Sequence, residues 1–577
     1  MTPRANNRRL PLALGMLLAA AGFSFAPALR TAHAQAQAQG GNPVDALPTP
    51  PVPTRPSTAP RGTRILQPPP QAQPPAQQGQ AITPTRFDIE GVQSIAFEEV
   101  AALFAPFAGQ PTTVGKLAEA AQQVTAMYQQ QGYALSFAYL PEQDFSGGVV
   151  RVVAVEGHIA TVQIEGEAGK AEPKIRALAE RIRQERPLRM ETFERYTQLM
   201  GQLPGIGVEA TAVPPTTTDG AGALQLQVSR QPYQVSLGTD IRTKRPRAVV
   251  TGVINDPFVA GGRLSGSTML GTQDGERYGA LAYSQMVGTE GLTLRAETSL
   301  YKGDPDAHLN TPPAIRRFTD YRRAEFSARY PLVLKARESL YLSGGIYGIN
   351  NADDYRNPAT GAMLTDEVKV RAVYAQASVS KATETRSRYL ALRLTRGLDA
   401  LGASSAVRAN FAGALPVNRA RLDFTRVGVD ASQRNDWGNR WGTAVSMGAQ
   451  YSPHILPSTE RVSFGGTRFA RGYAAGEVAS DSGWGVGLEV NRSFGVDMAY
   501  VTQIQPYVLL EAARVYSQAG ALAFSKLSSA SLGVRVSGGG YYTVDVALSK
   551  PTGDPSPENP RREPRLSALI SYNFSKR

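Results

Sequence analysis

The 577-residue sequence contains no cysteine and only four histidines. The lack of cysteine excludes a disulfide framework and any metal or redox site built from thiolates. No HExxH, GxSxG or P-loop pattern is present, and the histidines are scattered along the chain at His33, His158, His308 and His454. We therefore expect that the protein is not an enzyme and that it holds no metal or other cofactor.

Long apolar runs are missing except at the start of the chain. A positively charged start, an apolar stretch over residues 10–29 and an A-x-A site at residues 32–34 are typical of a signal peptide spanning residues 1–34. Pro11 and Pro27 interrupt the apolar stretch, which disfavours the alternative of a membrane anchor. No later segment supplies the about 20 consecutive apolar residues that a membrane helix needs. The sequence therefore predicts an exported protein.

Acidic residues are outnumbered by basic ones, and the formal net charge is +13. Residues 1–34 contain four arginines and no acidic residue, so the rest of the chain carries 13 − 4 = +9. In an exported protein this excess favours attraction to anionic lipopolysaccharide and disfavours nucleic-acid binding.

Two small α/β domains are predicted after a polar segment. Residues 35–81 are rich in proline, glutamine and alanine, which predicts an extended linker. Residues 82–157 combine a strand, two helices and two further strands, and residues 158–231 repeat this order. In the second repeat the helices are expected over residues 175–183 and 190–201. The sequence thus predicts two domains of the same β-α-α-β-β type.

Residues 232–577 show a different pattern, in which polar and apolar residues alternate over segments of about ten residues, as in lipid-facing barrel strands. Val544 and Val546, for example, alternate with Thr543 and Asp545. Connections are mostly long after odd-numbered segments and mostly short after even-numbered ones. We expect a mainly β protein whose 16-stranded antiparallel transmembrane barrel leaves no free strand edge in the lipid; a soluble β-sandwich or β-helix is the alternative. The segments begin near residues 233, 248, 263, 276, 291, 319, 338, 368, 387, 419, 440, 483, 505, 528, 541 and 565.

The longest loop, residues 453–482, contains the stretch Ser463-Phe464-Gly465-Gly466-Thr467-Arg468-Phe469-Ala470-Arg471-Gly472-Tyr473. Its end resembles the (V/I)RGY signature of the transporters of two-partner secretion systems and of the wider barrel-assembly superfamily, with Ala470 in place of the usual branched residue. The two α/β repeats resemble tandem POTRA domains. The chain is therefore similar to the TpsB-type transporters of the haemolysin-activator kind over about residues 82–574.

This resemblance implies that the loop folds back into the pore. The loop residues that it singles out are Phe464, Gly465, Gly466, Arg471, Gly472 and Tyr473. A guanidinium buried in a narrow lumen needs a carboxylate partner, because burying it alone costs several kcal/mol. The family places an F-x-D-x-G-like motif where this chain has residues 509–513. Glu511 is therefore the expected partner of Arg471, and Glu489 is the fallback.

The resemblance also implies a function and a location. Such transporters lie in the outer membrane with their POTRA domains in the periplasm, where they capture an unfolded, β-rich exoprotein and pass it through the barrel. Strand addition to an exposed POTRA edge is the expected mode of capture, in a groove beside the strands of the second domain. We expect a monomer. An outer-membrane protein assembly factor of the same superfamily and a diffusion porin are the alternatives.

A basic cluster follows the first predicted barrel strand. In the expected topology it lies outside the cell, where it either contacts lipopolysaccharide phosphates or is simply solvated. Its members are Arg242, Lys244, Arg245 and Arg247.

Overall fold

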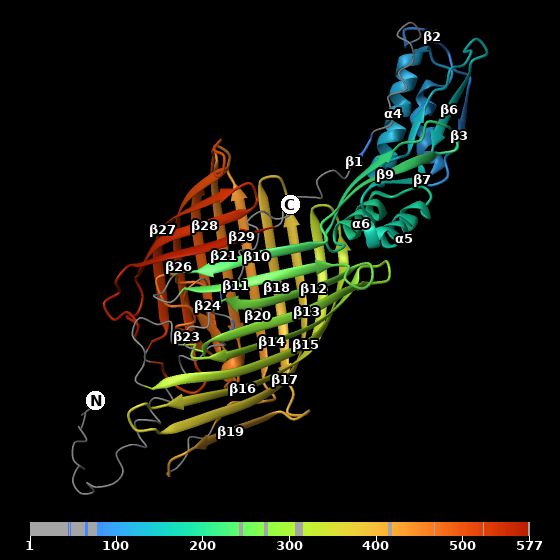
Figure 1. Cartoon of the computed structure of the whole chain (residues 1–577). Coiled ribbons are helices and arrows are strands. Elements are labelled where there is room, and N and C mark those ends of the chain that lie inside the picture. The colour runs from blue at the N-terminus through green and yellow to red at the C-terminus, as the bar shows by residue number, and fades with distance from the viewer. Residues whose placement is uncertain are drawn as a thin grey trace, which may run out of the picture.

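The chain forms two small α/β domains that project from one end of a large β-barrel (Figure 1). The predicted signal peptide and most of the predicted linker lie outside the residues that the structure describes. No helix within the described residues is both long and apolar enough to cross a membrane. This computed structural model describes residues 44, 47, 64–66, 78–241, 246–270, 275–305, 315–412, 418–466, 468–522 and 524–574.

The first α/β domain packs two helices against a three-stranded sheet. Strand β6 lies between β3, to which it is parallel, and β5, to which it is antiparallel. Val114, Leu117 and Val124 recur at helical spacing on α4, so one face of this helix is buried in the domain core. The elements are β2 (Ala81–Ile82), β3 (Arg86–Glu90), α3 (Phe97–Phe104), η2 (Ala105–Phe107), β4 (Thr112–Thr113), α4 (Val114–Gln130), β5 (Phe137–Tyr139) and β6 (Val149–Val155).

The second α/β domain repeats this plan, and its helix α6 has the predicted bounds. Its sheet has the order β1-β8-β9-β7, with β7 parallel to β9 and β8 antiparallel to β9. Strand β1 comes from the predicted linker and pairs with β8 in parallel. The elements are β1 (Arg64–Ile65), β7 (His158–Gly166), η3 (Gly169–Ala171), α5 (Glu172–Arg183), α6 (Met190–Gly201), β8 (Ile206–Val213) and β9 (Ala221–Arg230).

The remaining strands form a closed antiparallel barrel of sixteen strands, as predicted. The barrel closes where β10 pairs with β29, with Ser236 opposite Asn573. Two short strands extend the wall: β19 (Ser404–Ala409) pairs with β17, and β25 (Phe494–Gly495) pairs with β26. The sixteen strands are β10 (Tyr233–Asp240), β11 (Arg247–Asn255), β12 (Gly262–Leu270), β13 (Arg277–Val287), β14 (Leu292–Gly303), β15 (Arg316–Leu334), β16 (Glu338–Arg356), β17 (Met363–Ala382), β18 (Arg386–Gly397), β20 (Thr425–Asp436), β21 (Trp441–Tyr451), β24 (Ser482–Arg492), β26 (Gln503–Tyr516), β27 (Lys526–Gly538), β28 (Tyr542–Pro551) and β29 (Arg565–Asn573).

Two predicted strand starts differ clearly from the structure, and one of them is that of β17, which begins at Met363 and not near residue 368. The sequence pattern places a start near residue 419, whereas β20 begins at Thr425. Before Thr425 the chain leaves the sheet: the Arg421 amide donates to the carbonyl of Ile455, and Phe424 is buried in a cluster of aromatic side chains. The apolar residues of this stretch therefore pack against other side chains and do not face lipid.

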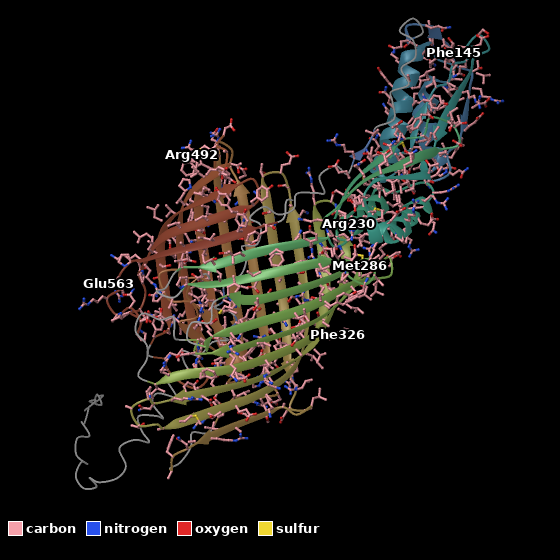
Figure 2. All side chains as sticks on the ribbon, in the orientation of Figure 1. Phe145, Arg230, Met286, Phe326, Arg492 and Glu563 are labelled. Atoms are coloured by element: carbon pink, nitrogen blue, oxygen red, sulfur yellow. The ribbon has the colours of Figure 1, made fainter. Side chains whose placement is uncertain are left out.

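The barrel wall has an apolar outer face and a more polar inner face. On β26, Val508 and Leu510 are exposed, whereas the alternate residues Tyr507 and Glu511 are buried. Phe326 on β15, labelled in Figure 2, is another exposed apolar residue of the wall. This alternation follows from the two-residue period of a β-strand, and it places the polar residues inside.

The second domain is docked on short turns of the barrel. Arg181 forms an ion pair of 2.6 Å with Glu290 in the turn between β13 and β14, and Tyr196 donates to the same carboxylate at 3.0 Å. Met286 of the barrel, labelled in Figure 2, belongs to the hydrophobic core of the second domain. A Cβ atom on Gly291 would come within 2.5 Å of Leu199, so glycine permits the close contact. The short turns thus lie at the end of the barrel that carries the two α/β domains.

Candidate functional site

The long loop between β21 and β24 folds into the barrel. It forms a small hairpin from β22 (Val462–Phe464) and β23 (Val478–Ser480). Phe464, Ala470 and Tyr473 are almost completely buried, in a cluster with inward-facing residues of β26 and β27. The loop segment that the sequence singled out therefore contacts the inner face of the wall.

The tip of the loop turns sharply before Arg471. Gly465 has φ +113° and Gly466 has φ +67°, and Phe469 and Ala470 also adopt positive φ values of 58° and 60°. Such a conformation costs a non-glycine residue about 1–2 kcal/mol, and a β-branched side chain tolerates it poorly. This backbone gives a physical reason for alanine at position 470, where the resembling family usually has a branched residue.

Arg471 is held by two different groups on the wall. Its guanidinium Nη1 donates to the Tyr507 hydroxyl at 2.5 Å and lies 3.4 Å from the Asp545 carboxylate. Its backbone amide donates to Oε2 of Glu511 at 2.7 Å. The expected pairing between the Arg471 and Glu511 side chains is thus corrected: Glu511 binds the loop backbone, and Asp545 is the carboxylate that faces the guanidinium.

These groups belong to a larger anchor network, which we define as Arg471, Tyr507, Glu511, Asp545, Arg535 and Glu489. Tyr507 donates to Asp545 at 2.6 Å, and Arg535 lies 3.2 Å from Asp545 and 2.6 Å from Glu489. The fallback partner Glu489 therefore pairs with Arg535 and not with Arg471. Arg535 and Asp545 are directly opposite each other on β27 and β28. The alternation on β28 already placed Asp545 on the polar face, and this was the signal that the sequence offered for it.

Gly472 and Tyr473 bring the loop against the last strands. A Cβ atom on Gly472 would lie 2.7 Å from the backbone nitrogen of Pro551, so only glycine fits without a shift. The Tyr473 hydroxyl donates to the carbonyl of Asp554 at 2.8 Å, and its ring packs 5.7 Å from that of Phe524. The Arg-Gly-Tyr sequence thus combines a charge contact, a close backbone approach and an aromatic contact.

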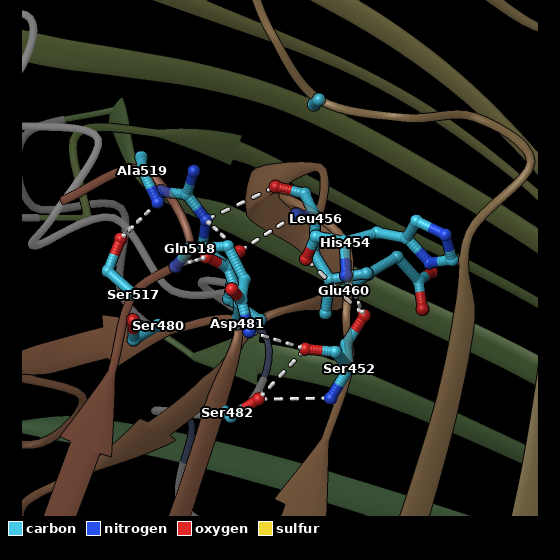
Figure 3. Close-up of polar contacts among 12 residues, drawn as sticks. Ser452, His454, Leu456, Glu460, Ser480, Asp481, Ser482, Ser517, Gln518 and Ala519 are labelled. Atoms are coloured by element: carbon cyan, nitrogen blue, oxygen red, sulfur yellow. Dashed lines mark hydrogen bonds and ion pairs between the residues drawn. The ribbon is translucent and has the colours of Figure 1, made fainter.

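A second set of contacts, which the sequence analysis missed, holds the base of the loop. Glu460 is only 1% exposed; it pairs with Arg426 at 3.0 Å and accepts a hydrogen bond from Tyr347 at 2.9 Å. Asp481 accepts from the backbone amides of Leu456 and Gln518 at 2.8 and 2.9 Å (Figure 3). The loop is therefore fixed both at its tip and at its base.

Part of the predicted linker also contacts the barrel interior. Leu47 is buried beside the inward-facing Tyr301, Tyr321 and Tyr347. Farther along the same segment, β1 lies on the second α/β domain. The described parts of residues 35–81 therefore contact both the barrel interior and the second α/β domain.

The structure describes only one of the four residues predicted as a basic cluster near the first barrel hairpin. Arg242, Lys244 and Arg245 lie outside the described residues. Arg247 is buried and forms an ion pair of 2.6 Å with Glu276. Burial and pairing withdraw Arg247 from any lipid surface, so the expected lipopolysaccharide contact is wrong for this residue.

Comparisons with known proteins agree with this architecture. Residues 82–157 match the POTRA domain, ShlB-type, and residues 265–536 match the haemolysin secretion/activation protein ShlB/FhaC/HecB family, a family of secretion channels and not of enzymes. The outer membrane transporter CdiB of Escherichia coli O6:K15:H31 (strain 536 / UPEC) is 23% identical over 466 residues, which cover 76% of this chain and 74% of the relative.

Solved structures share the fold. CdiB from Escherichia coli has a TM-score of 0.65 at 19% identity, over 96% of this chain and 100% of that structure. CdiB from Acinetobacter baumannii has a TM-score of 0.57 at 13% identity, over 95% and 97% of the two chains. With its ShlB-type POTRA match, its match over residues 265–536 and its closed barrel, the chain is similar to the TpsB-type outer-membrane transporters of the haemolysin secretion/activation family.

Proposed function

We propose that this transporter captures an unfolded, β-rich exoprotein in the periplasm and secretes it through the barrel. The observation that carries the proposal is the loop held inside the bore by the anchor network. Arg471 at the tip and Glu460 at the base hold this loop inside the barrel, which is typical of a barrel plugged by its own segments and differs from a water-filled diffusion channel. A pore that must stay closed until a polypeptide enters does need such contacts.

Strand addition to the second POTRA domain supports capture. Among the described residues, β1 covers the outer edge of β8 only opposite Thr211 and Ala212. No described strand pairs with residues 206–210 on that edge, and Ile206, Gly207, Val208 and Glu209 line the cavity that leads into the barrel. Backbone hydrogen bonds along this edge hold an extended segment without demanding a strict sequence. This edge is our candidate for the groove beside the second domain's strands.

The position of the second domain on the barrel supports delivery of the exoprotein to the pore. Its helices α5 and α6 contact the β13–β14 turn, which fixes β8 close to the mouth of the barrel. A segment added to β8 is therefore already at the entrance. Passage then requires the loop to leave its contacts with the wall.

The proposal is tested by expressing the transporter together with a candidate exoprotein, sought as a large exported β-rich protein encoded next to it, and measuring export of that candidate. We expect export to require both POTRA domains and to fall when residues 453–482 are deleted. The full chain is also compared with that deletion in planar bilayers. A wild-type pore as conductive as the deletion variant would favour a diffusion porin. Loss of other outer-membrane proteins on depletion, with normal export of the exoprotein, would favour an assembly factor.

A further inference from the structure

A large cavity joins the second POTRA domain to the bore of the barrel. Its volume is about 2620 Å³, and its lining runs from β8 and β9 of the domain to inner-face residues of strands around the barrel. A polypeptide that moves from the β8 edge to the bore crosses this cavity, which we call the vestibule.

The vestibule is strongly basic. Among the described residues that line it, nine carry a positive side chain and three a negative one. The acidic residues are Glu209, Glu325 and Glu338, and the basic residues are Arg263, Arg295, Arg329, Lys335, Arg337, Lys381, Arg388, Arg434 and Arg440.

Local pairing offsets part of this excess: Arg295 pairs with Glu297 at 2.6 Å, Arg337 with Glu384 at 3.3 Å and Lys335 with Glu191 at 3.9 Å, all of them carboxylates outside the lining. Of the three acidic lining residues, Glu325 pairs with Arg323, outside the lining, and Glu338 lies 3.5 Å from Lys381. Arg263 and Arg388 donate to neutral amides, at 3.3 Å to Asn255 and at 2.9 Å to Gln433. The positive charge of these two arginines is therefore not cancelled by the groups that they contact.

The excess does not continue at the anchor network. The anchor network contains two arginines, Arg471 and Arg535, and three carboxylates, those of Glu489, Glu511 and Asp545. An anionic segment is thus attracted at the mouth and is not held by the charges deeper in the bore. This arrangement favours entry followed by onward movement.

We infer that the first segment of the exoprotein to enter the barrel is polar and acidic. The inference rests on the proposed secretion function and adds the chemistry of the cargo segment. Opposite charges across a water-filled space raise the local concentration of the partner and set its orientation. At separations of about 8 Å in water each unpaired arginine contributes roughly a factor of two in affinity, so three together contribute about tenfold.

The inference is tested by peptide binding to the full-length protein in detergent. Two labelled, unstructured Ser/Gly peptides of equal length are compared, one carrying glutamates and the other lysines. The triple variant Arg263→Gln, Arg388→Gln, Arg440→Gln removes three vestibule charges. The matched control Arg86→Gln, Arg408→Gln, Arg561→Gln removes three exposed arginines that do not line the vestibule.

We expect the wild type and the control to bind the glutamate peptide at least about tenfold more tightly than the lysine peptide, because the three arginines attract glutamates and also repel lysines, and we expect the triple variant to lose most of this preference. High salt should remove the preference as well. Equal binding of the two peptides by the wild type, or an unchanged preference in a folded triple variant, would overturn the inference. The wild-type comparison and its salt dependence hold even if the triple variant does not fold. Normal export of the exoprotein alongside such a failure would leave the proposed secretion function standing.

Discussion

The contact between Arg471 and Asp545 provides the sharpest test of the loop anchor. We consider the substitution Asp545→Asn, which keeps the size of the side chain and removes its charge. The Arg471 and Asp545 side chains are each only 13% exposed, and Tyr507 bridges them. The substitution leaves the Arg471 guanidinium facing a neutral amide in a nearly dry site.

The magnitude follows from the burial of this pair. Removing one partner of a buried ion pair costs about 3–5 kcal/mol. The Tyr507 hydroxyl still accepts from Arg471, and Arg535 keeps its contact with Glu489, so the lower end of this range applies. Because each 1.4 kcal/mol is a factor of ten, about 3 kcal/mol raises the population with a released loop by roughly a hundredfold.

The assay is trypsin cleavage of the folded protein in detergent. Arg461 and Arg471 lie in the loop with side chains only 11% and 13% exposed, and they become accessible to trypsin when the loop leaves the wall. Cleavage at these two residues is the readout, because the Arg468 side chain is already exposed. We expect cleavage in the loop to be about a hundred times faster in Asp545→Asn than in the wild type. Asp423→Asn is the control, since its ion pair with Arg421 is on the surface and contributes at most about 1 kcal/mol.

Two results would refute this reasoning. One is a loop that stays as resistant to trypsin in Asp545→Asn as in the wild type, with the barrel still folded by its heat-dependent gel shift. The other concerns a charge exchange. Arg471→Glu combined with Glu511→Arg should not restore protection, because Glu511 accepts from the loop backbone. Full restoration would show that the two side chains pair directly.

Three further predictions follow from other parts of the molecule. Glu460→Gln should leave Arg426 without its carboxylate, release the base of the loop and raise pore conductance in planar bilayers; unchanged conductance would contradict the role of the base contacts. Gly291 has φ +86°, and a Cβ atom there would lie 2.5 Å from Leu199. The substitution Gly291→Ala should therefore loosen the contact between the second POTRA domain and the barrel and speed amide exchange in α6. The control Gly288→Ala should have no such effect, because nothing lies within 4 Å of its added Cβ atom. Burial lowers the pKa of His158 in that domain, so the unfolded chain binds the proton more tightly than the folded chain does. The stability that is present above about pH 6.5 should therefore be lost as the pH falls. The variant His158→Gln should show a flatter pH dependence of thermal unfolding.

The sequence by itself determined the number and the facing of the barrel strands. The facing of each strand can be predicted from its own residues, because alternate side chains point to opposite faces whichever strand lies next to it. Val544 and Val546 therefore mark the lipid side of β28, and Asp545 the inner side, before any partner strand is known. The loop asymmetry and the Arg-Gly-Tyr stretch are local in the same way. Local pattern also placed the starts of most strands, and it placed the start of β20 wrongly where apolar residues pack on other side chains.

Only the tertiary structure decided which inner residues meet. Glu489, Glu511 and Asp545 all face inward, on β24, β26 and β28, and alternation alone does not rank them. Their heights along the bore depend on the register between neighbouring strands, which places Arg535 opposite Asp545 and Glu511 opposite Ser529. That register follows from the tilt and stagger needed to close sixteen strands, which is a property of the whole barrel. The same closure gathers basic side chains from distant strands at the POTRA end, and no local segment of the sequence displays the resulting vestibule.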